Sequence, residues 1–450
     1  MADSIANESP TYSSVSNEQR SLTREQKEAV GLLSIGTSLE MFDLFLYIHM
    51  AVFLDQIFFP KADDTSWILS NIAICSAFIL KPIGGVILGW LGDRVGRTFI
   101  IFISTFFTGI TCIIIAMMPT YQNIGILAAY AITCCRVVQG IMATGEFYSA
   151  HIYISETISV PKNRYAMGVI LSIGSWVGGK FLATALAAIA LFCIENGVKE
   201  AWRAAFLCGG FIALIGIYAR RTLHETRAFS EASKLSKVIP IDQVKNGIGN
   251  EPISKLSLFH YLILTLGNIV FGLFPFTYCK DLLVQMGYSA SAIALQSTYV
   301  GIFYTFTMIG YFFLVRFYCP LKIMKYRTYG SIILLLFVPY LIKNASTNSD
   351  ILVLQCLVLF FAVTTFPAGP LIYRLFPILK RTRAILIPNA LSDAFGFLFL
   401  NFSIPILSMY FFNYTYIIMA LPLAIISIFS IKHFQTLDQN KITSHNTVSL

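Results

Sequence analysis

The stretch Lys81–Thr98, KPIGGVILGWLGDRVGRT, decides the fold of this 450-residue chain. A glycine-rich apolar segment ends in a short turn with Asp93, Arg94 and Arg97, and a second apolar run begins at once. The turn is too short to form a soluble subdomain, but it suffices to connect two helices at a membrane surface. The stretch therefore predicts a helical hairpin that crosses a membrane twice.

The composition extends this prediction to the whole chain. Hydrophobic residues make up 56% and charged residues 12%, whereas about a quarter of the residues of a soluble domain are charged. Apolar runs of about 20 residues, long enough to cross about 30 Å of hydrocarbon, recur throughout. We therefore predict an all-α polytopic membrane protein and exclude both a soluble protein with one anchor and a β-barrel.

Twelve spans are predicted from these runs. The longest gap between them is polar and basic, and it divides the spans six and six. The predicted spans are 30–54, 67–90, 98–118, 123–150, 165–192, 202–220, 258–279, 289–315, 327–343, 351–373, 384–410 and 413–432. The predicted order is an N-terminal tail (1–29), a six-helix bundle (30–220), a linker (221–257), a second six-helix bundle (258–432) and a C-terminal tail (433–450).

Loop charges set the orientation. Most of the 32 Lys and Arg residues fall in the two tails and in alternate loops, and such residues accumulate on the cytoplasmic side. We therefore predict that both termini are cytoplasmic, and the net charge of +9 calls for no nucleic-acid partner. The outer loops hold Lys61, Lys199, Arg203, Lys280 and Lys343.

The first span carries two carboxylates at membrane depth. Glu40 and Asp43 lie one helical turn apart, with Tyr47 one turn further on the same face, and both acids lie about 15–20 Å from the start of the span. Two carboxylates this close in a low dielectric cannot both ionise easily. The pair is typical of proton coupling, although it could instead lock helices together by pairing with intramembrane cations.

Further polar residues lie inside other spans. Arg136 is at mid-depth in the fourth span, near Gln139, and its planar fork suits a carboxylate from Glu40, Asp43 or a substrate. Glu146 lies near the cytoplasmic end of that span, where an interhelical ion pair is the simpler role.

Charged residues in three more spans add candidates. Lys81 in the second span and Lys180 in the fifth are expected to form structural pairs, with substrate contact as the alternative. In the eleventh span Asp393, one turn after Asn389, has no evident partner in its own half and is a further candidate for proton or substrate binding.

Motifs of soluble chemistry are missing from the sequence. It has no GxxxxGK[ST] loop, no GxSxG, no HExxH and no Cys/His metal spacing. We therefore expect neither an enzyme nor a cofactor or metal, and we expect an ion or solute gradient to supply the energy.

The turn Gly89-x-Leu91-Gly92-Asp93-Arg94-x-Gly96-Arg97 resembles the signature between the second and third helices of the major facilitator superfamily. The chain also resembles the metabolite:proton symporter branch, which includes carriers of proline and betaine, shikimate, citrate and α-ketoglutarate. The segments that carry this similarity lie in the first half, at 40–47, 58–60, 81–85, 136–146, 156–164, 202–206 and 220–229.

The second half departs from the pattern of this branch. Its equivalent turn, Leu314–Lys325, has Arg316 but no aspartate and no GxxGR. Lys81 stands where an arginine is usual, and Asp393 stands where the branch usually has no acid.

The resemblance implies alternating access of two bundles around a central cavity. The Asp93 turn would latch them at the cytoplasmic face, with Asp93 at the N-terminus of a neighbouring helix and the arginines paired with acids such as Glu156. The expected latch residues are Gly89, Gly92, Asp93, Arg94, Gly96, Arg97, Glu146, Glu156 and Arg164.

We therefore expect a monomeric, proton-coupled symporter of a small carboxylate-bearing metabolite, zwitterionic or anionic, in a bacterial inner membrane. Glu40, Asp43 and Asp393 are the candidates for proton coupling. The candidates for substrate or charge pairing are Arg136, Gln139, Tyr47, Lys81 and Asn389. The alternatives are an uncoupled facilitator or exchanger and, from another class, a transporter-derived receptor.

Overall fold

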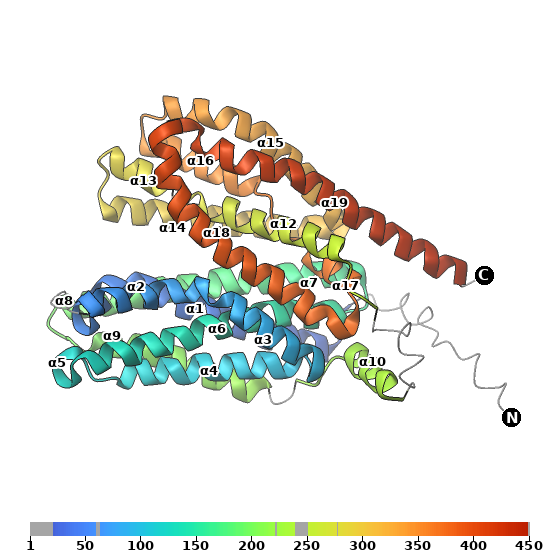
Figure 1. Cartoon of the computed structure of the whole chain (residues 1–450), viewed down its shortest axis with the longest axis horizontal. Coiled ribbons are helices and arrows are strands. Elements are labelled where there is room, and N and C mark those ends of the chain that lie inside the picture. The colour runs from blue at the N-terminus through green and yellow to red at the C-terminus, as the bar shows by residue number, and fades with distance from the viewer. Residues whose placement is uncertain (1–20, 60–63, 221–222, 239–250, 277, 449–450) are drawn as a thin grey trace.

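The computed structural model describes residues 21–59, 64–220, 223–238, 251–276 and 278–448. This part of the chain contains helices and no strand, and the helices form two lobes, shown one above the other in Figure 1. The prediction of an all-α fold with two helical bundles is confirmed.

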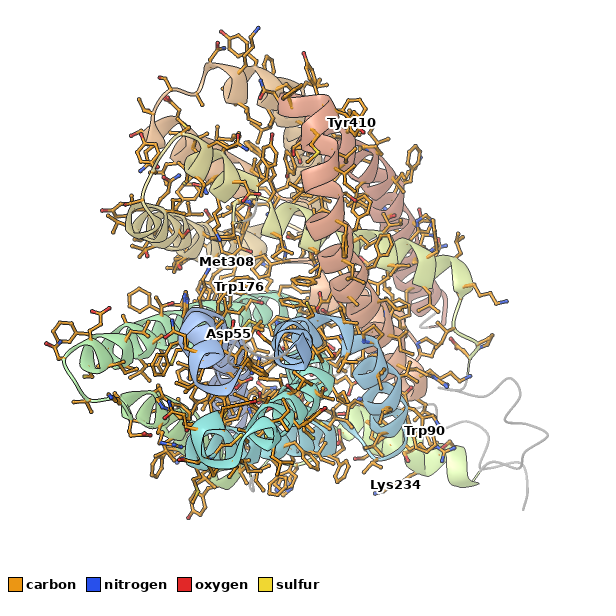
Figure 2. All side chains as sticks on the ribbon, turned by 60° about the vertical axis from the view of Figure 1, so that its left-hand side comes forward. Asp55, Trp90, Trp176, Lys234, Met308 and Tyr410 are labelled. Carbon is orange, nitrogen blue, oxygen red and sulfur yellow. The ribbon has the colours of Figure 1, made fainter. Side chains whose placement is uncertain are left out.

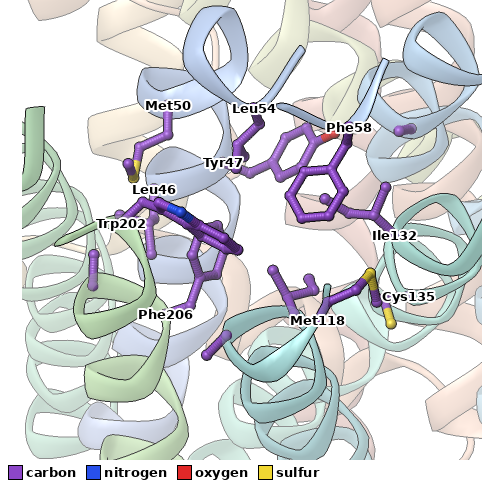
Figure 3. Close-up of a cluster of buried hydrophobic side chains, with 14 of the residues drawn as sticks. Leu46, Tyr47, Met50, Leu54, Phe58, Met118, Ile132, Cys135, Trp202 and Phe206 are labelled. Atoms are coloured by element: carbon purple, nitrogen blue, oxygen red, sulfur yellow. The ribbon is translucent and has the colours of Figure 1, made fainter. Parts of the chain in front are cut away.

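The first bundle is the lower lobe of Figure 1. Its core includes Trp202 and Phe58, whose rings meet edge to face at 5.6 Å, and Figure 3 shows the side chains gathered around them. Its helices are α1 (Arg24–Phe58), α2 (Asp64–Ile79), α3 (Lys81–Arg94), α4 (Arg97–Met117), α5 (Tyr121–Ile124), α6 (Ile126–Thr157), α7 (Pro161–Ile173), the π-helical η1 (Gly174–Lys180), α8 (Phe181–Glu195) and α9 (Ala201–Ala219).

The second bundle follows the linker helix α10 (Arg227–Val238). It has its own apolar core, in which Phe274 stacks on Tyr416 at 3.4 Å. Its helices are α12 (Lys255–Leu273), α13 (Tyr278–Gln285), α14 (Ala290–Phe317), α15 (Pro320–Asn344), α16 (Asn348–Phe360), α17 (Gly369–Leu375), the short η3 (Ile378–Lys380), α18 (Arg381–Phe411), the short η4 (Phe412–Tyr414) and α19 (Thr415–Val448).

Nine helices of the described residues are long and apolar enough to cross a membrane. The predicted second, ninth and tenth spans are the ones outside this set. The second is divided between α2 and α3, the ninth is α15 with polar residues near both ends, and the tenth is divided between α16 and α17.

The predicted span 67–90 is interrupted at Leu80, where α2 ends and α3 begins. Pro82 is one of the first residues of α3, and its ring nitrogen cannot donate to the carbonyl one turn earlier. The break places Lys81 at a helix junction.

The predicted continuous span 351–373 is wrong. α16 ends at Phe360 and α17 begins at Gly369, and the irregular backbone between them is held by polar side chains. Thr365 N donates to Asn268 Oδ1 (2.7 Å), and Arg327 donates to the Phe366 carbonyl (2.9 Å). Irregular backbone at membrane depth requires such partners.

The ends of the chain also differ from the prediction. The residues predicted as a C-terminal tail, 433–450, continue α19 as a helix through Val448. α1 begins at Arg24 rather than at residue 30, because Thr23 and Gln26 form a reciprocal capping box.

The two bundles meet most closely where α18 crosses α3, at the end of the molecule where α19 finishes (Figure 1). We call this end the cytoplasmic face, after the orientation that the loop charges predict. Glycines permit the approach: a Cβ on Gly85 would lie 2.8 Å from Ala390 Cβ, and one on Gly89 would lie 2.8 Å from Arg383 Cα.

Candidate functional site

Asp43 of α1 lies in a dense polar cluster inside the first bundle. Arg136 Nη1 lies 3.0 Å from Asp43 Oδ2 and 2.7 Å from Gln139 Oε1. Gln139 Nε2 donates to Asp43 Oδ1 (2.8 Å), and Cys112 Sγ lies 3.3 Å from the same oxygen. The Arg136 guanidinium also lies over the Tyr47 ring at 4.1 Å. Both oxygens of Asp43 are therefore engaged, and its charge is neutralised.

Glu40, one turn before Asp43, lies in a different environment. It is 7% exposed and accepts a hydrogen bond from Phe147 N (3.2 Å), and no cation of the described residues forms an ion pair with it. It lines a cavity of about 20 Å³ together with Asp43, Lys81 and Arg136. That volume is enough for roughly one water molecule. Glu40 is a buried carboxylate beside a small polar space.

Lys81 and Asp393 form an ion pair across the two bundles. Lys81 Nζ lies 2.7 Å from Asp393 Oδ2, and both side chains are buried. Phe78 of α2 stacks on Phe397 of α18 at 4.3 Å beside this pair. The partner of Asp393 is thus in the other half of the chain, a pairing that the sequence does not reveal.

The side-chain amide of Asn389 is engaged away from the Lys81–Asp393 pair. Its amide donates to Tyr261 Oη (2.6 Å) and to the Ile385 carbonyl (2.7 Å). Asn389 is therefore directed into its own bundle, toward α12.

Asp93 and Glu156 connect the bundles at the cytoplasmic face. Asp93 Oδ1 accepts from Thr382 N at the start of α18 (2.9 Å), and Asp93 Oδ2 lies 3.1 Å from Arg383 Nε. Glu156 Oε1 lies 3.0 Å from Arg97 Nη2 and 2.7 Å from Arg381 Nη1. These contacts hold the cytoplasmic ends together.

Asp93 lies just beyond the predicted second span. Burial raises the pKa of its carboxyl to about 6, against the opposing effects of Arg97, the Thr382 backbone and Arg383. Asp93 is therefore mainly ionised at neutral pH, which strengthens its hydrogen bond to the first turn of α18.

Three predicted latch residues make contacts within the first bundle instead. Glu146 pairs with Arg220, the C-cap of α9 (2.8 Å). The Arg164 guanidinium donates to the carbonyls of Ile158 and Ser159. The Arg94 guanidinium lies 3.9 Å from the ring centroid of Trp90, in its own helix.

The predicted latch glycines shape the α3–α4 turn. Gly96 has φ of +119°, which side-chain-bearing residues rarely adopt. Thr98 N beyond it donates to Glu225 Oε2 (3.0 Å). A Cβ on Gly92 would lie 2.7 Å from Thr382 Cγ2, so Gly92, like Gly89, lets α18 approach.

Sequence reasoning missed the cations that complete these networks. Arg220, Arg381 and Arg383 each stand at a helix end, where a basic residue is ordinary. These arginines differ from other arginines near helix ends only in the ion pairs that the folded structure gives them, with Glu146, Glu156 and Asp93 respectively.

Two helical bundles, charged pairs at membrane depth and ionic contacts between the bundles at one face define a membrane transporter rather than an enzyme. A family model described as Major Facilitator Superfamily matches residues 33–385. The chain belongs to this superfamily.

Two bacterial transport proteins are similar in sequence to about half of this chain. The inner membrane metabolite transport protein YhjE of Escherichia coli is 31% identical over 52% of this chain and 52% of its own length. The proline/betaine transporter of Salmonella typhimurium is 33% identical over 46% of this chain and 41% of its own length. The matches thus span about half the length of these relatives.

Solved structures share the fold over most of the chain. The proton:xylose symporter XylE aligns with a TM-score of 0.72 at 14% identity, covering 91% of this chain and 95% of that one. The human organic anion transporter MFSD10 aligns with a TM-score of 0.68 at 14% identity, covering 91% of this chain and all (100%) of that one. At these identities the comparisons establish the fold.

Replacing Glu156 with glutamine should open the cytoplasmic face. Arg97 and Arg381 would lose the anion that they share, and breaking a buried ion pair costs about 3–5 kcal/mol. Spin labels at Lys162→Cys and Lys322→Cys, on exposed positions of the two bundles, should report a longer distance by double electron–electron resonance in a background without the native cysteines.

Arg94→Gln is the matched control, because Arg94 stacks on Trp90 within the first bundle. It should leave the distance between the labels unchanged. An unchanged distance in Glu156→Gln would show that this network does not hold the bundles together.

Proposed function

We propose that this protein is a proton-coupled symporter of a small carboxylate-bearing metabolite and that Glu40 carries the coupled proton. The observation that carries the proposal is the contrast between two carboxylates one turn apart. Asp43 is neutralised by Arg136, whereas Glu40 is buried without an ion-pair partner among the described residues.

An unpaired carboxylate at membrane depth favours its neutral form, because desolvation penalises the ionised one. Glu40 lies beside a space for about one water molecule, which places a proton donor or acceptor within reach of its carboxyl. Asp43 has cationic and amide donors on both oxygens, which stabilise its ionised form. Glu40 is therefore the better proton carrier, and Asp43 with Arg136 organises the helices around it.

Lys81 provides a link from Glu40 to the other bundle. It lines the same cavity as Glu40 and pairs with Asp393 across the interface. When Glu40 is ionised, Lys81 is shared between two carboxylates, one in each bundle. When Glu40 is protonated, Lys81 belongs to Asp393 alone, so proton binding in the first bundle changes the force that holds the two bundles together.

The names of the relatives support the substrate class and the energy source. Proline and betaine, named for one relative, both carry a carboxylate, and a protein that shares the fold is named a proton symporter. The relative named as an inner membrane protein of a bacterium supports the same location here. We propose a monomer, since each chain contains both bundles.

Uptake into proteoliposomes tests this function. With a panel of labelled proline, betaine, citrate and shikimate, an acidic exterior should drive accumulation of at least one solute above its outside concentration. A protonophore should abolish that accumulation and leave only equilibration.

The runner-up, an uncoupled facilitator or exchanger, predicts another result. The solute would equilibrate at the same rate and to the same level with or without the pH gradient. That outcome would contradict proton coupling.

A further inference from the structure

Lys180 stands apart from the other cations of the membrane spans. It lies within the 35-residue span Pro161–Glu195, about 28 Å from its start and 22 Å from its end at about 1.5 Å per residue. Its side chain is too short to reach the membrane surface from there. A charge held at this depth usually faces a partner or a cavity.

Aromatic rings surround the Lys180 ammonium. Nζ lies 4.8 Å from the ring centroid of Phe45, 5.8 Å from that of Trp176 and 4.2 Å from that of Phe276. Phe45 and Trp176 belong to the first bundle and Phe276 to the second. Rings stabilise a cation through their negative faces, but they do not neutralise it.

No carboxylate of the described residues forms an ion pair with Lys180, whereas Lys81, Arg136 and Arg220 each have one. Arg327 also lacks a carboxylate partner in this part of the chain, but carbonyl and hydroxyl oxygens accept its hydrogens. Lys180 therefore keeps three N–H donors for an anion that the described part of the chain does not supply.

The position of Lys180 suits a transported ligand. Lys180 ends the π-helical turn η1, a deviation from the α-helix that often marks functional sites. Trp176 in that turn meets Tyr304 of α14 edge to face at 6.0 Å, and Figure 2 shows Trp176 and Met308 at the boundary between the lobes. Lys180 is half-buried, and its ammonium lies against the Phe276 ring of the second bundle, so it lies at the boundary between the bundles.

We infer that Lys180 binds the carboxylate of the transported solute and that this solute is a net anion without an ammonium group. The inference rests on the proposed symport function and narrows its substrate class. Lys180 already occupies the ring faces that would hold a ligand ammonium, and its charge repels a second cation.

The balance of charge agrees with this assignment. One proton on Glu40 and one monoanion on Lys180 add no net charge to the loaded transporter. A zwitterion loaded with a proton would instead leave the Lys180 charge uncompensated inside the membrane.

Matched pairs of isosteres test the inference. Cyclopentanecarboxylate is proline without its nitrogen charge, and 3,3-dimethylbutyrate is betaine with carbon in place of the quaternary nitrogen. For the purified full-length protein, each anion should raise the unfolding temperature at concentrations about tenfold or more below those of its zwitterionic partner, because only the zwitterion brings a second cation close to Lys180.

The variant Lys180→Met keeps the unbranched stem and removes the charge, so it should abolish the preference for the anions. Lys180→Arg keeps a cation at this position, so it should show the same preference for the anions as the wild type. Lys322→Met, an exposed lysine of the cytoplasmic face, should leave it unchanged. The unfolding temperature without ligand and a single peak in size-exclusion chromatography establish that each variant is folded.

Three results would overturn the inference: no response of the wild-type protein to either anion, an equal or stronger response to the zwitterions, or a preference that survives in folded Lys180→Met. The proposed symport has a separate readout. Accumulation of proline or betaine driven by the pH gradient would leave symport standing while this inference fails. Anion binding that depends on Lys180, without accumulation driven by the pH gradient, would support this inference and contradict the proposed symport.

Discussion

Glu40→Gln should abolish accumulation driven by the pH gradient while leaving exchange of solute across the membrane intact. Glutamine has the shape of glutamic acid, and its carbonyl oxygen still accepts from Phe147 N. It cannot release a proton, so the neutral, loaded form becomes permanent. Proteoliposomes would show counterflow of labelled solute at near wild-type rates, with no concentration above the outside level.

The control for this prediction is Glu200→Gln. Glu200 pairs with Arg203 at an exposed position outside the predicted spans, and its side chain is 64% exposed. This variant should accumulate solute like the wild type. If Glu40→Gln also accumulated solute to the wild-type level, another group would have to carry the proton.

Asp43→Asn should destabilise the first bundle, in contrast to Glu40→Gln. The change leaves Arg136 buried with neutral partners, and breaking one side of a buried ion pair costs about 3–5 kcal/mol. The unfolding temperature of the purified protein should fall by several degrees. The corresponding change Glu200→Gln, at an exposed ion pair, should lower the free energy of unfolding by less than about 1 kcal/mol.

A double variant separates charge from shape in this cluster. Asp43→Asn with Arg136→Gln removes both charges, so it should recover most of the stability lost in Asp43→Asn alone. An Asp43→Asn protein as stable as the wild type would show that the pair does not hold the bundle, and the distinction drawn between Asp43 and Glu40 would lose its basis.

The sequence predicted the fold well because length and apolarity alone define membrane spans. It did not predict the interruptions at Leu80 and between Phe360 and Gly369, since an apolar run looks the same whether it is one helix or two. Pro82 is a local signal for the first break. The second depends on Asn268 and Arg327, which lie far away in the sequence.

The sequence predicted which candidate residues share one face of a helix, but it did not predict which residues pair between helices. The spacing of Glu40, Asp43 and Tyr47 places them on one face, and Arg136 was found by its depth. The sequence could not choose which carboxylate Arg136 meets, nor could it pair Lys81 with Asp393. Such pairs depend on the packing of distant helices.

The central claim is that Glu40 binds the coupled proton, and proton uptake on solute binding tests it most directly. The purified protein in weakly buffered detergent solution, with a pH indicator and at a pH alkaline enough for Glu40 to be ionised before the solute binds, would be mixed with a solute that it accumulates. We predict that the wild type takes up about one proton for each solute bound and that Glu40→Gln takes up none while still binding the solute. Equal proton uptake by both proteins would contradict the claim.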